Sequence, residues 1–127
     1  MGKSAFATAI NCMDGRVQYA VAEFLKKKYK VDYVDMITEP GLDGLLAMDQ
    51  AKAAIESIKR KIGVSTGRHG SRHIAVAGHH DCAGNPVDEE THLAHIRAAV
   101  KVVKSWGFNA DVIGLWVDDK WKASEVK

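Results

Sequence analysis

The 127-residue sequence contains only two cysteines and lacks any long run of apolar residues. No stretch approaches the ~18 apolar residues of a membrane-spanning helix, so the sequence predicts no membrane partner. The first residues, "MGKSAFATAINC", hold a short apolar run that includes Asn11, and they lack the cleavage site of a signal peptide. We therefore expect a cytoplasmic protein, whose reducing surroundings argue against a disulfide between Cys12 and Cys82. Two unrelated buried thiols, a redox pair or a metal-binding pair remain open.

A strong excess of charge of one sign is also missing, because the formal net charge is only +2. Proteins that bind nucleic acids usually carry a clustered basic face, so the sequence predicts no nucleic-acid partner. Hydrophobic residues make up 46% and charged residues 27% of the chain, as in an ordinary globular protein. Neither an internal repeat nor a linker divides the sequence, and its length suits a single domain. We expect residues 1–127 to form one domain.

The apolar residues follow an alternation of strand-like and helix-like segments. The expected strands are residues 5–11, 31–38, 73–79 and 110–117, and the expected helices are residues 17–30, 42–63 and 88–107. This order predicts an α/β fold, an open parallel sheet with helices on both faces. Right-handed connections and the commonest winding place the four strands in the order 2-1-3-4. Residues 64–72 are expected to form a loop, and residues 118–127 a polar tail.

Reactive side chains follow two of the expected strands, at the point where the winding of the sheet reverses. Cys12 comes directly after strand 5–11, while His79 and Cys82 lie at the end of strand 73–79. In an open parallel sheet, the ligand crevice lies beyond the carboxyl ends of the strands at this point. We therefore expect the two thiols and the imidazole to meet in one crevice.

Two thiolates and one imidazole form a typical ligand set for Zn²⁺, which usually binds four ligands in a tetrahedron. Cys12, His79 and Cys82 would leave the fourth position open, as in a catalytic site, where zinc lowers the pKa of bound water to about 7. The adjacent His80 is the alternative imidazole ligand, but the spacing to Cys82 favours His79. The sequence thus predicts a mononuclear zinc site.

Asp14 and Arg16 accompany the first of these ligands in the stretch "CMDGR", residues 12–16. Alternate residues of an extended chain point the same way, so Arg16 can hold the Asp14 carboxylate through two parallel hydrogen bonds. A carboxylate held in this way stays ionised and is drawn away from the metal, where it can orient the bound water for attack. Without Arg16, Asp14 could become the fourth ligand and close the site. We expect Asp14 and Arg16 to form a catalytic dyad.

The stretches "CMDGR" and "GHHDC", residues 12–16 and 78–82, together resemble the paired signature Cys-x-Asp-x-Arg and His-x-x-Cys of the β-class carbonic anhydrases. The resemblance implies that Zn²⁺ is bound by Cys12, His79 and Cys82, and that Asp14 and Arg16 form the dyad. It also implies an obligate homodimer with its sites near the subunit interface. The implied reaction is the reversible hydration of carbon dioxide to bicarbonate, in which zinc hydroxide attacks the substrate.

The sequence departs from that family's pattern in two stretches and in its length. Gly15 stands where the family usually has serine, and "TEPG", residues 38–41, stands where an Arg-Asn-x-Gly-like stretch is common. The N-terminal helices that commonly wrap the partner subunit are missing. Two alternatives therefore stay open. One is a zinc hydrolase of carbonyl sulfide or carbon disulfide, and the other is a non-catalytic zinc-binding homologue in which Asp14 closes the site.

The remaining histidines and aromatic residues receive simpler interpretations. His92 and His95 are expected on a partly exposed helix face, and "RHGSRH", residues 68–73, in a solvated loop at the amino end of the sheet. Glu39, Pro40, Gly41 and Asp43 either line the pocket or form a plain turn, and Asp81 is expected in a turn or, alternatively, in a contact that supports the metal ligands. The tryptophans expected in the core or at an interface are Trp106, Trp116 and Trp121.

Overall fold

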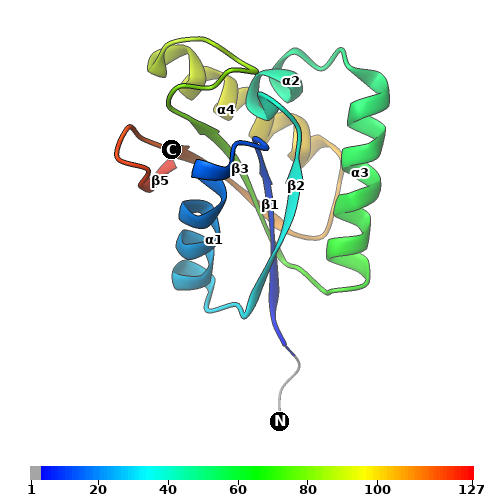
Figure 1. Ribbon diagram of the computed structural model, residues 1–127. Helices are drawn as coiled ribbons and strands as arrows, with labels where there is room; N and C mark the ends of the chain where they lie inside the picture. Colours follow the sequence, from blue (N-terminus) through cyan, green and yellow to red (C-terminus); the bar gives the residue numbers. More distant parts are fainter. Residues whose placement is uncertain (1–3) are drawn as a thin grey trace.

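The fold is built around a five-stranded sheet with the strand order β2-β1-β3-β4-β5 (Figure 1). It is seen in a computed structural model that describes residues 4–127. The strands are β1 (Phe6–Asn11), β2 (Tyr33–Thr38), β3 (His73–His79), β4 (Asp111–Val117) and β5 (Ala123–Val126). The helices are α1 (Gly15–Tyr29), α2 (Leu42–Met48), α3 (Lys52–Gly67) and α4 (Glu89–Ser105). This order of strands and helices confirms the predicted α/β fold.

The first four strands pair in parallel and confirm the predicted order 2-1-3-4. β1 and β3 lie side by side through pairs such as Ile10–Val76, so their carboxyl ends open at the same edge of the sheet. The expectation of a tail at residues 118–127 is wrong, because Ala123–Val126 form β5 and pair antiparallel with β4. This short segment has little strand character of its own, and its pairing with β4 decides its conformation.

The expected helix at residues 42–63 is wrong in its extent, because two helices occupy this part of the chain. α2 ends at Met48 and is capped by Asp49, which has a left-handed backbone with φ of 52° and donates its N–H to the Leu45 carbonyl oxygen at 3.2 Å. Aspartate tolerates this conformation better than most residues, so the break needs no glycine. α3 continues past Gly63 to Gly67, which shortens the expected loop before β3. None of the helices within residues 4–127 is long and apolar enough to cross a membrane.

Both faces of the sheet are covered by helices, as predicted: α1 lies on one face, and α2, α3 and α4 lie on the other (Figure 1). In β3, Ile74 and Val76 pack on the side of α2, α3 and α4, whereas Ala75 and Ala77 pack on the side of α1. A strand buried on both faces is typical of parallel sheets. This strand ends at His79, which therefore stands where the core meets the carboxyl edge.

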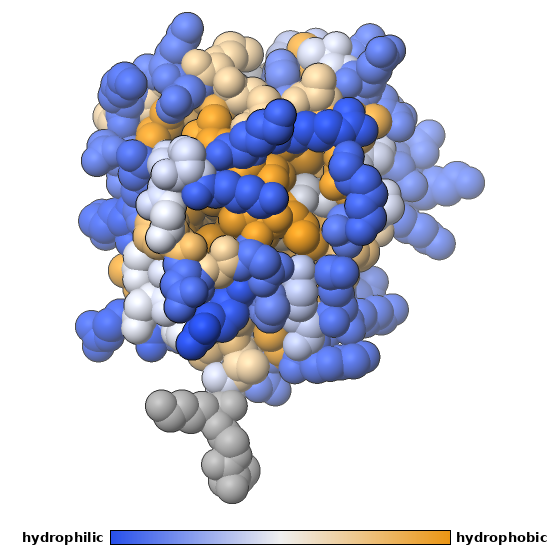
Figure 2. Space-filling model, turned by 180° about the vertical axis from the view of Figure 1, so that it is seen from behind, coloured by the Kyte–Doolittle hydropathy of each residue, from blue (hydrophilic) through white to orange (hydrophobic). Residues whose placement is uncertain are grey.

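The side of the molecule formed by α4, β4 and β5 carries a shallow hollow of about 390 Å³. Its apolar lining includes Ile96, Val100, Ile113 and Val126, and charged side chains of α4 stand around it. Figure 2, which views the molecule from behind, shows apolar surface framed by hydrophilic side chains on this side. The hollow lies beside the amino half of β4, so it is separate from the crevice at the carboxyl edge.

Candidate metal centre

The carboxyl edge of β1 and β3 brings together the residues that the sequence predicts as metal ligands. Cys12 directly follows β1, His79 ends β3, and Cys82 lies in the loop after β3. One ligand atom from each of these side chains lies within 4.8 Å of the others, and all three residues are buried. Two sulfurs and one nitrogen at this spacing can share a single ion.

The imidazole of His79 has the tautomer that a metal ligand needs. Its Nδ1 lies 2.7 Å from the His80 carbonyl oxygen, which can only accept, so Nδ1 carries the proton and Nε2 carries the lone pair. Nε2 is buried and has no hydrogen-bond partner within residues 4–127. Burial lowers the pKa of His79, which keeps the ring neutral. A buried nitrogen without a partner is costly unless it binds something, so His79 fits a metal ion.

Both thiols of the centre are free and buried. Burial, followed by the neighbouring Cys12, raises the pKa of Cys82 to about 11. Hydrogen bonds from the backbone amides of Asn85 and Gly84 act in the opposite direction and lower this pKa. The Cys82 thiol therefore keeps its proton at neutral pH until a cation displaces it. Once deprotonated, two thiolates and a neutral imidazole are donors that suit Zn²⁺.

Asp14 and Arg16 lie beside the ligands, at the start of α1. Arg16 Nε donates to Asp14 Oδ1 at 3.0 Å, and Arg16 Nη2 donates to Asp14 Oδ2 at 2.7 Å. These are the two parallel hydrogen bonds that the sequence predicts. The hydrogen bonds from the Arg16 side chain are the main reason why the pKa of Asp14 falls to about 2. Asp14 is therefore ionised at neutral pH.

The expected route to this pair, an extended chain with alternating side chains, is wrong. Asp14 is the N-cap of α1, and its Oδ1 also accepts the backbone N–H of Arg16 at 2.9 Å. Arg16 lies in the first turn, so the start of a helix sets the distance between the two side chains. A Cβ added to Gly15 would meet nothing within 4 Å outside its own turn, so a serine would fit at this position.

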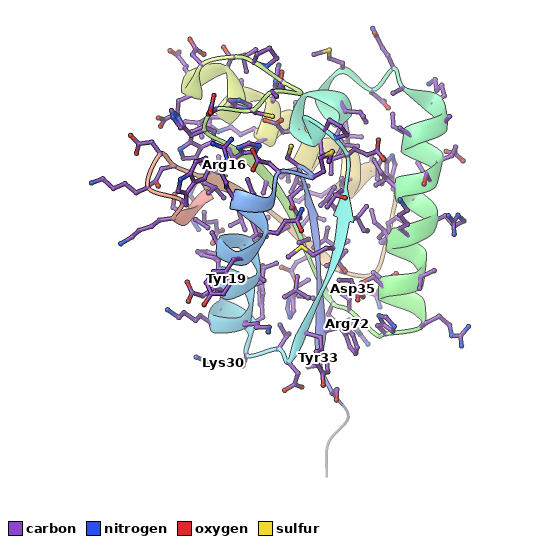
Figure 3. The ribbon with its side chains drawn as sticks, viewed as in Figure 1. Arg16, Tyr19, Lys30, Tyr33, Asp35 and Arg72 are labelled. Atoms are coloured by element: carbon purple, nitrogen blue, oxygen red, sulfur yellow. The ribbon has the colours of Figure 1, made fainter. Side chains whose placement is uncertain are left out.

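Two further residues contact the Arg16 guanidinium: Asp81 accepts hydrogen bonds at its edge, and Trp121 lies against its face. Arg16 Nη1 donates to Asp81 Oδ2 at 3.3 Å, and Arg16 Nη2 donates to the Asp81 carbonyl oxygen at 3.2 Å. The guanidinium carbon of Arg16 lies 4.4 Å from the centre of the Trp121 ring. Figure 3 shows Arg16 at the N-terminal end of α1, beside the connection between β4 and β5 that carries Trp121. Sequence reasoning expected Trp121 in the core or at an interface and missed its contact with Arg16, because nothing distinguished this connection from a tail.

A buried polar group holds the loop of Cys82 against α2 and α4. His92 Nδ1 lies 2.6 Å from Asp43 Oδ2, and Asn85 Nδ2 donates to Asp43 Oδ1 at 3.1 Å. Asn85 Nδ2 also lies 3.0 Å from His95 Nδ1. The expected exposure of His92 is wrong, because this residue is only 1% exposed. Asp43, expected in a turn or in the pocket wall, is instead a buried residue of α2.

The loop after β2 packs directly on the loop that carries Cys82. Gly41 has a left-handed backbone with φ of +60°, and a Cβ there would lie 2.5 Å from the Gly84 carbonyl carbon. A Cβ on Gly84 would in turn lie 2.5 Å from the backbone nitrogen of Gly41. Backbone meets backbone at this point, so neither position accepts a side chain. The stretch "TEPG" therefore supports the loop that carries the candidate ligand Cys82.

Residues 68–73 lie at the amino end of the sheet, as predicted. His69 Nδ1 lies 2.7 Å from Asp35 Oδ2, and His73 Nδ1 lies 2.5 Å from Asp111 Oδ1. Figure 3 shows Arg72 and Asp35 toward the end of the molecule opposite Arg16. Carboxylates engage these histidines, so the segment contributes nothing to the metal centre.

A family model described as putative carbonic anhydrase matches residues 2–127. The chain belongs to this family. The match extends over nearly the whole sequence, whereas the resemblance seen in the sequence rested on two short motifs. It confirms that resemblance to carbonic anhydrases. No curated protein sequence matches this family member.

Two solved carbonic anhydrases share the fold of this family member. The carbonic anhydrase from Glaciozyma antarctica matches with a TM-score of 0.58 and 16% identity, over 94% of this chain and 81% of that one. The β-carbonic anhydrase CafA of the fungal pathogen Aspergillus fumigatus matches with a TM-score of 0.55 and 16% identity, over 99% of this chain and 77% of that one. At such identity, the likeness shows the fold alone.

Proposed function

We propose that this member of the carbonic anhydrase family uses Zn²⁺ to catalyse the reversible hydration of carbon dioxide to bicarbonate. The observation that carries the proposal is the buried group of Cys12, His79 and Cys82 with the Asp14–Arg16 pair beside it. Membership of the family supports a lyase activity of this kind. The shared fold of the two solved carbonic anhydrases is consistent with it.

The three clustered side chains would hold the ion. His79 contributes Nε2, the nitrogen that its Nδ1 contact with the His80 carbonyl leaves free. Cys12 and Cys82 contribute thiolates, whose two negative charges balance those of a divalent cation. When bound, zinc lowers the pKa of a coordinated water to about 7 and so supplies hydroxide at neutral pH.

Asp14 supplies the acceptor that orients the attacking oxygen. Its carboxylate is ionised at neutral pH, because Arg16 holds its pKa at about 2. An ionised oxygen of Asp14 accepts a hydrogen bond from the attacking water and thereby aims a lone pair at the carbon of carbon dioxide. Hydration releases one proton, which leaves to solvent directly or through an exposed histidine such as His80.

Arg16 bears on the alternative of a non-catalytic zinc module, which requires Asp14 to become a metal ligand. Both carboxylate oxygens of Asp14 accept hydrogen bonds from Arg16, at 3.0 and 2.7 Å. Bidentate pairs of this kind are strong and fix geometry, so Arg16 opposes the movement of Asp14 toward the ion. This contact favours the catalytic function.

We further propose that the protein acts as a homodimer in the cytoplasm. Met13, between Cys12 and Asp14, is 60% exposed, and an apolar side chain at this place suits cover by a second copy. β2 forms an edge of the sheet, where a second copy could also approach. A reducing compartment keeps thiol ligands from oxidation. Sedimentation of the zinc-loaded protein tests the dimer, and a monomer at micromolar concentration would contradict it.

The decisive experiment measures zinc content and stopped-flow hydration of carbon dioxide on the same purified protein. The variant Asp14→Asn should keep its zinc and lose activity by about 100-fold or more, as when a residue that orients a proton-bearing nucleophile is removed. Asp35→Asn, at the other end of the sheet, is the matched control and should retain activity. Full turnover in Asp14→Asn would refute the dyad. Sulfide release from carbonyl sulfide or carbon disulfide, without hydration of carbon dioxide, would favour the alternative hydrolase.

A further inference from the structure

The guanidinium group of Arg16 is held from three directions although the side chain is 47% exposed. Asp14 takes two of its hydrogen bonds, and Asp81 takes two weaker ones, at 3.3 and 3.2 Å. The ring of Trp121 covers one face, 4.4 Å from the guanidinium carbon. Exposed arginines usually contribute little, because a long side chain loses its freedom when it is fixed. An exposed arginine fixed on two edges and one face therefore needs an explanation.

Trp121 has an unusual backbone that places its ring over Arg16. Its φ is 58°, in the left-handed region that bulky residues rarely adopt. Asp118 stabilises this turn: its carbonyl oxygen accepts the Trp121 N–H at 3.0 Å, and its Oδ1 accepts the N–H groups of Lys120 and Lys122 at 2.9 and 3.0 Å. Residues held in such regions persist only where the surroundings enforce them, and they gather at functional sites. Asp81, the other new contact of Arg16, has the same kind of backbone, with φ of 57°.

The indole of Trp121 is also anchored on α1 and close to the metal centre. It packs against the apolar cluster on the α1 side of the sheet and borders a small hollow that is also lined by Ala20 and Phe24. Its ring centre lies 6.4 Å from that of His79 and 6.3 Å from that of His80. The ring is therefore a fixed surface, because both the turn and the helix hold it.

We propose that Trp121 and Asp81 are positioning residues, which hold the Arg16 guanidinium in the plane where it gives two hydrogen bonds to Asp14. Neither residue needs to touch the reacting atoms, because both act through Arg16. The inference rests on the proposed function, since it assumes that the Asp14–Arg16 pair serves carbon dioxide hydration. It adds Trp121, from the connection between β4 and β5, to the contacts that fix the Asp14–Arg16 pair.

Asp14 and Asp81 both accept hydrogen bonds from the Arg16 guanidinium, and the position of the Trp121 ring determines how they share its donors. Asp81 is 71% exposed and free to follow Arg16, whereas Asp14 is fixed as the N-cap of α1. With the indole in place, the planar fork lies edge-on to Asp14, and only Nη1 reaches the Asp81 carboxylate, while Nη2 also donates to the Asp81 carbonyl oxygen. Without the indole, Arg16 can turn toward Asp81, and Asp14 then loses one or both of its hydrogen bonds.

The test compares Trp121→Leu with Trp121→Phe and with Trp106→Leu. Trp106 is a matched control, because it also lies under a cation, with Lys59 Nζ 5.2 Å from its ring, but belongs to the end of α4. Trp121→Leu should keep its zinc and lose about tenfold in kcat, the fold-change that a well-formed cation–π contact can supply. Trp121→Phe should recover most of that loss, and Trp106→Leu should keep wild-type kcat. Equal kcat in Trp121→Leu and wild type would overturn the proposal.

A second readout does not depend on activity. The Arg16 Nε–H donates to Asp14 at 3.0 Å, so its proton should exchange slowly with water in the wild type and in Trp106→Leu. Trp121→Leu should accelerate this exchange, measured by nuclear magnetic resonance of the nitrogen-labelled side chain, and Trp121→Phe should restore it. Unchanged exchange in Trp121→Leu would overturn the positioning role whatever the activity. Accelerated exchange in a protein that hydrates no carbon dioxide would uphold the positioning and refute the proposed function.

Asp81→Asn keeps the proposal testable if Trp121→Leu does not fold. Asparagine tolerates the left-handed backbone of Asp81 but carries no charge to hold the far corner of Arg16. This variant should keep its zinc and show a smaller fall in kcat, about threefold, with faster exchange of the Arg16 Nε proton. Wild-type exchange in Asp81→Asn, together with unchanged kcat, would overturn the proposed role of Asp81 and Trp121 in positioning Arg16.

Discussion

Histidines and carboxylates gather at both ends of the sheet, but the contacts of the histidines differ between the two ends. At the amino end, His69 and His73 each contact a carboxylate and stack on an aromatic ring, Phe6 or Tyr29. At the carboxyl end, His79 Nδ1 faces a peptide carbonyl, and its Nε2 is buried without a hydrogen-bond partner among residues 4–127. The comparison teaches that residue type alone does not mark a binding site. What distinguishes the candidate centre is a buried nitrogen that has no partner among residues 4–127 and belongs to a group with two thiols; His92 Nε2 is also unpartnered there but belongs to no such group.

The acid–histidine pairs at the two ends of the sheet also differ in how deeply they are buried. His73 and Asp111 lie on the surface of the amino end, whereas His92 and Asp43 are enclosed beneath the loop of Cys82. Surface pairs of this kind contribute little to stability, because water competes for both partners. Removing one partner of an enclosed pair strands the other without water, which is costly. The same two residue types thus form an exposed pair of little consequence for stability at one end and a buried pair that supports a loop at the other.

The largest expected effect comes from His79→Ala compared with His73→Ala. Loss of His79 removes one of the clustered ligands and should weaken zinc binding by more than the 10–100-fold that is typical for the loss of an outer-shell partner. Carbon dioxide hydration should disappear with the metal. His73→Ala should keep zinc and activity, since its side chain contacts Asp111 and Tyr29 at the amino end of the sheet. Metal analysis and competitive titration measure the effect, and equal zinc content in the two variants would remove His79 from the site.

The next effect is on stability, from Asp43→Ala compared with Asp111→Ala. Asp43→Ala strands the buried donors of His92 and Asn85 and should cost about 3 kcal/mol in the free energy of unfolding. Asp111→Ala should cost less than about 1 kcal/mol, because its partners can turn to water. Urea unfolding of the metal-free proteins separates this cost from that of zinc binding. Similar losses of unfolding free energy in both variants would show that the buried group of Asp43, His92 and Asn85 does not stabilise the loop of Cys82.

A smaller effect should appear in the pH dependence of zinc binding. The pKa of Cys82 lies at about 11 in the metal-free protein, so zinc must displace its proton throughout the neutral range. Apparent affinity should therefore rise with pH, by up to about tenfold per unit for each displaced proton. His73→Ala should show the same slope, because the histidine pairs of the amino end take no part. A pH-independent affinity would contradict the raised pKa of Cys82.

The smallest effect concerns Tyr29 at the amino end. Burial, and then its hydrogen bond to Asp111 at 3.0 Å, raise the pKa of Tyr29 above the ordinary value of 10.0. A raised pKa favours the neutral form in the folded state, so the contribution to stability is present below pH 10 and is lost as pH rises through the raised value. Absorbance titration of tyrosinate in wild type and Tyr29→Phe should assign the last ionisation to Tyr29. Titration of Tyr29 at its ordinary value would show that Asp111 does not hold it.

Much of the fold and the metal cluster could be predicted, because both depend on local patterns. Continuous apolar runs such as residues 73–79 indicate buried parallel strands, and the winding rule then orders them. Cys12 and His79 each stand at the end of such a run, so topology alone predicts that they meet. The pairing of Asp14 with Arg16 could be predicted from their spacing, even though the backbone between them begins a helix.

The rest depends on contacts between residues distant in the sequence. His92 is buried because Asp43 lies on another helix that happens to face it, and helical periodicity cannot show this. Residues 123–126 are a strand only because β4 offers them an edge. The position of Trp121 follows from a left-handed backbone that no glycine or asparagine announces. None of these three features can be predicted until the neighbouring part of the folded chain is known.

The contact between Gly41 and Gly84 has a consequence for any change of the candidate metal centre. The two loops touch through main-chain atoms, so neither can shift by the width of a methyl group without pushing the other. Cys82 and the chain segment that follows β2 therefore move as one mechanical unit. Attempts to widen the entrance for a bulkier substrate would have to redesign both loops together, because lengthening either one alone would displace the candidate ligand Cys82.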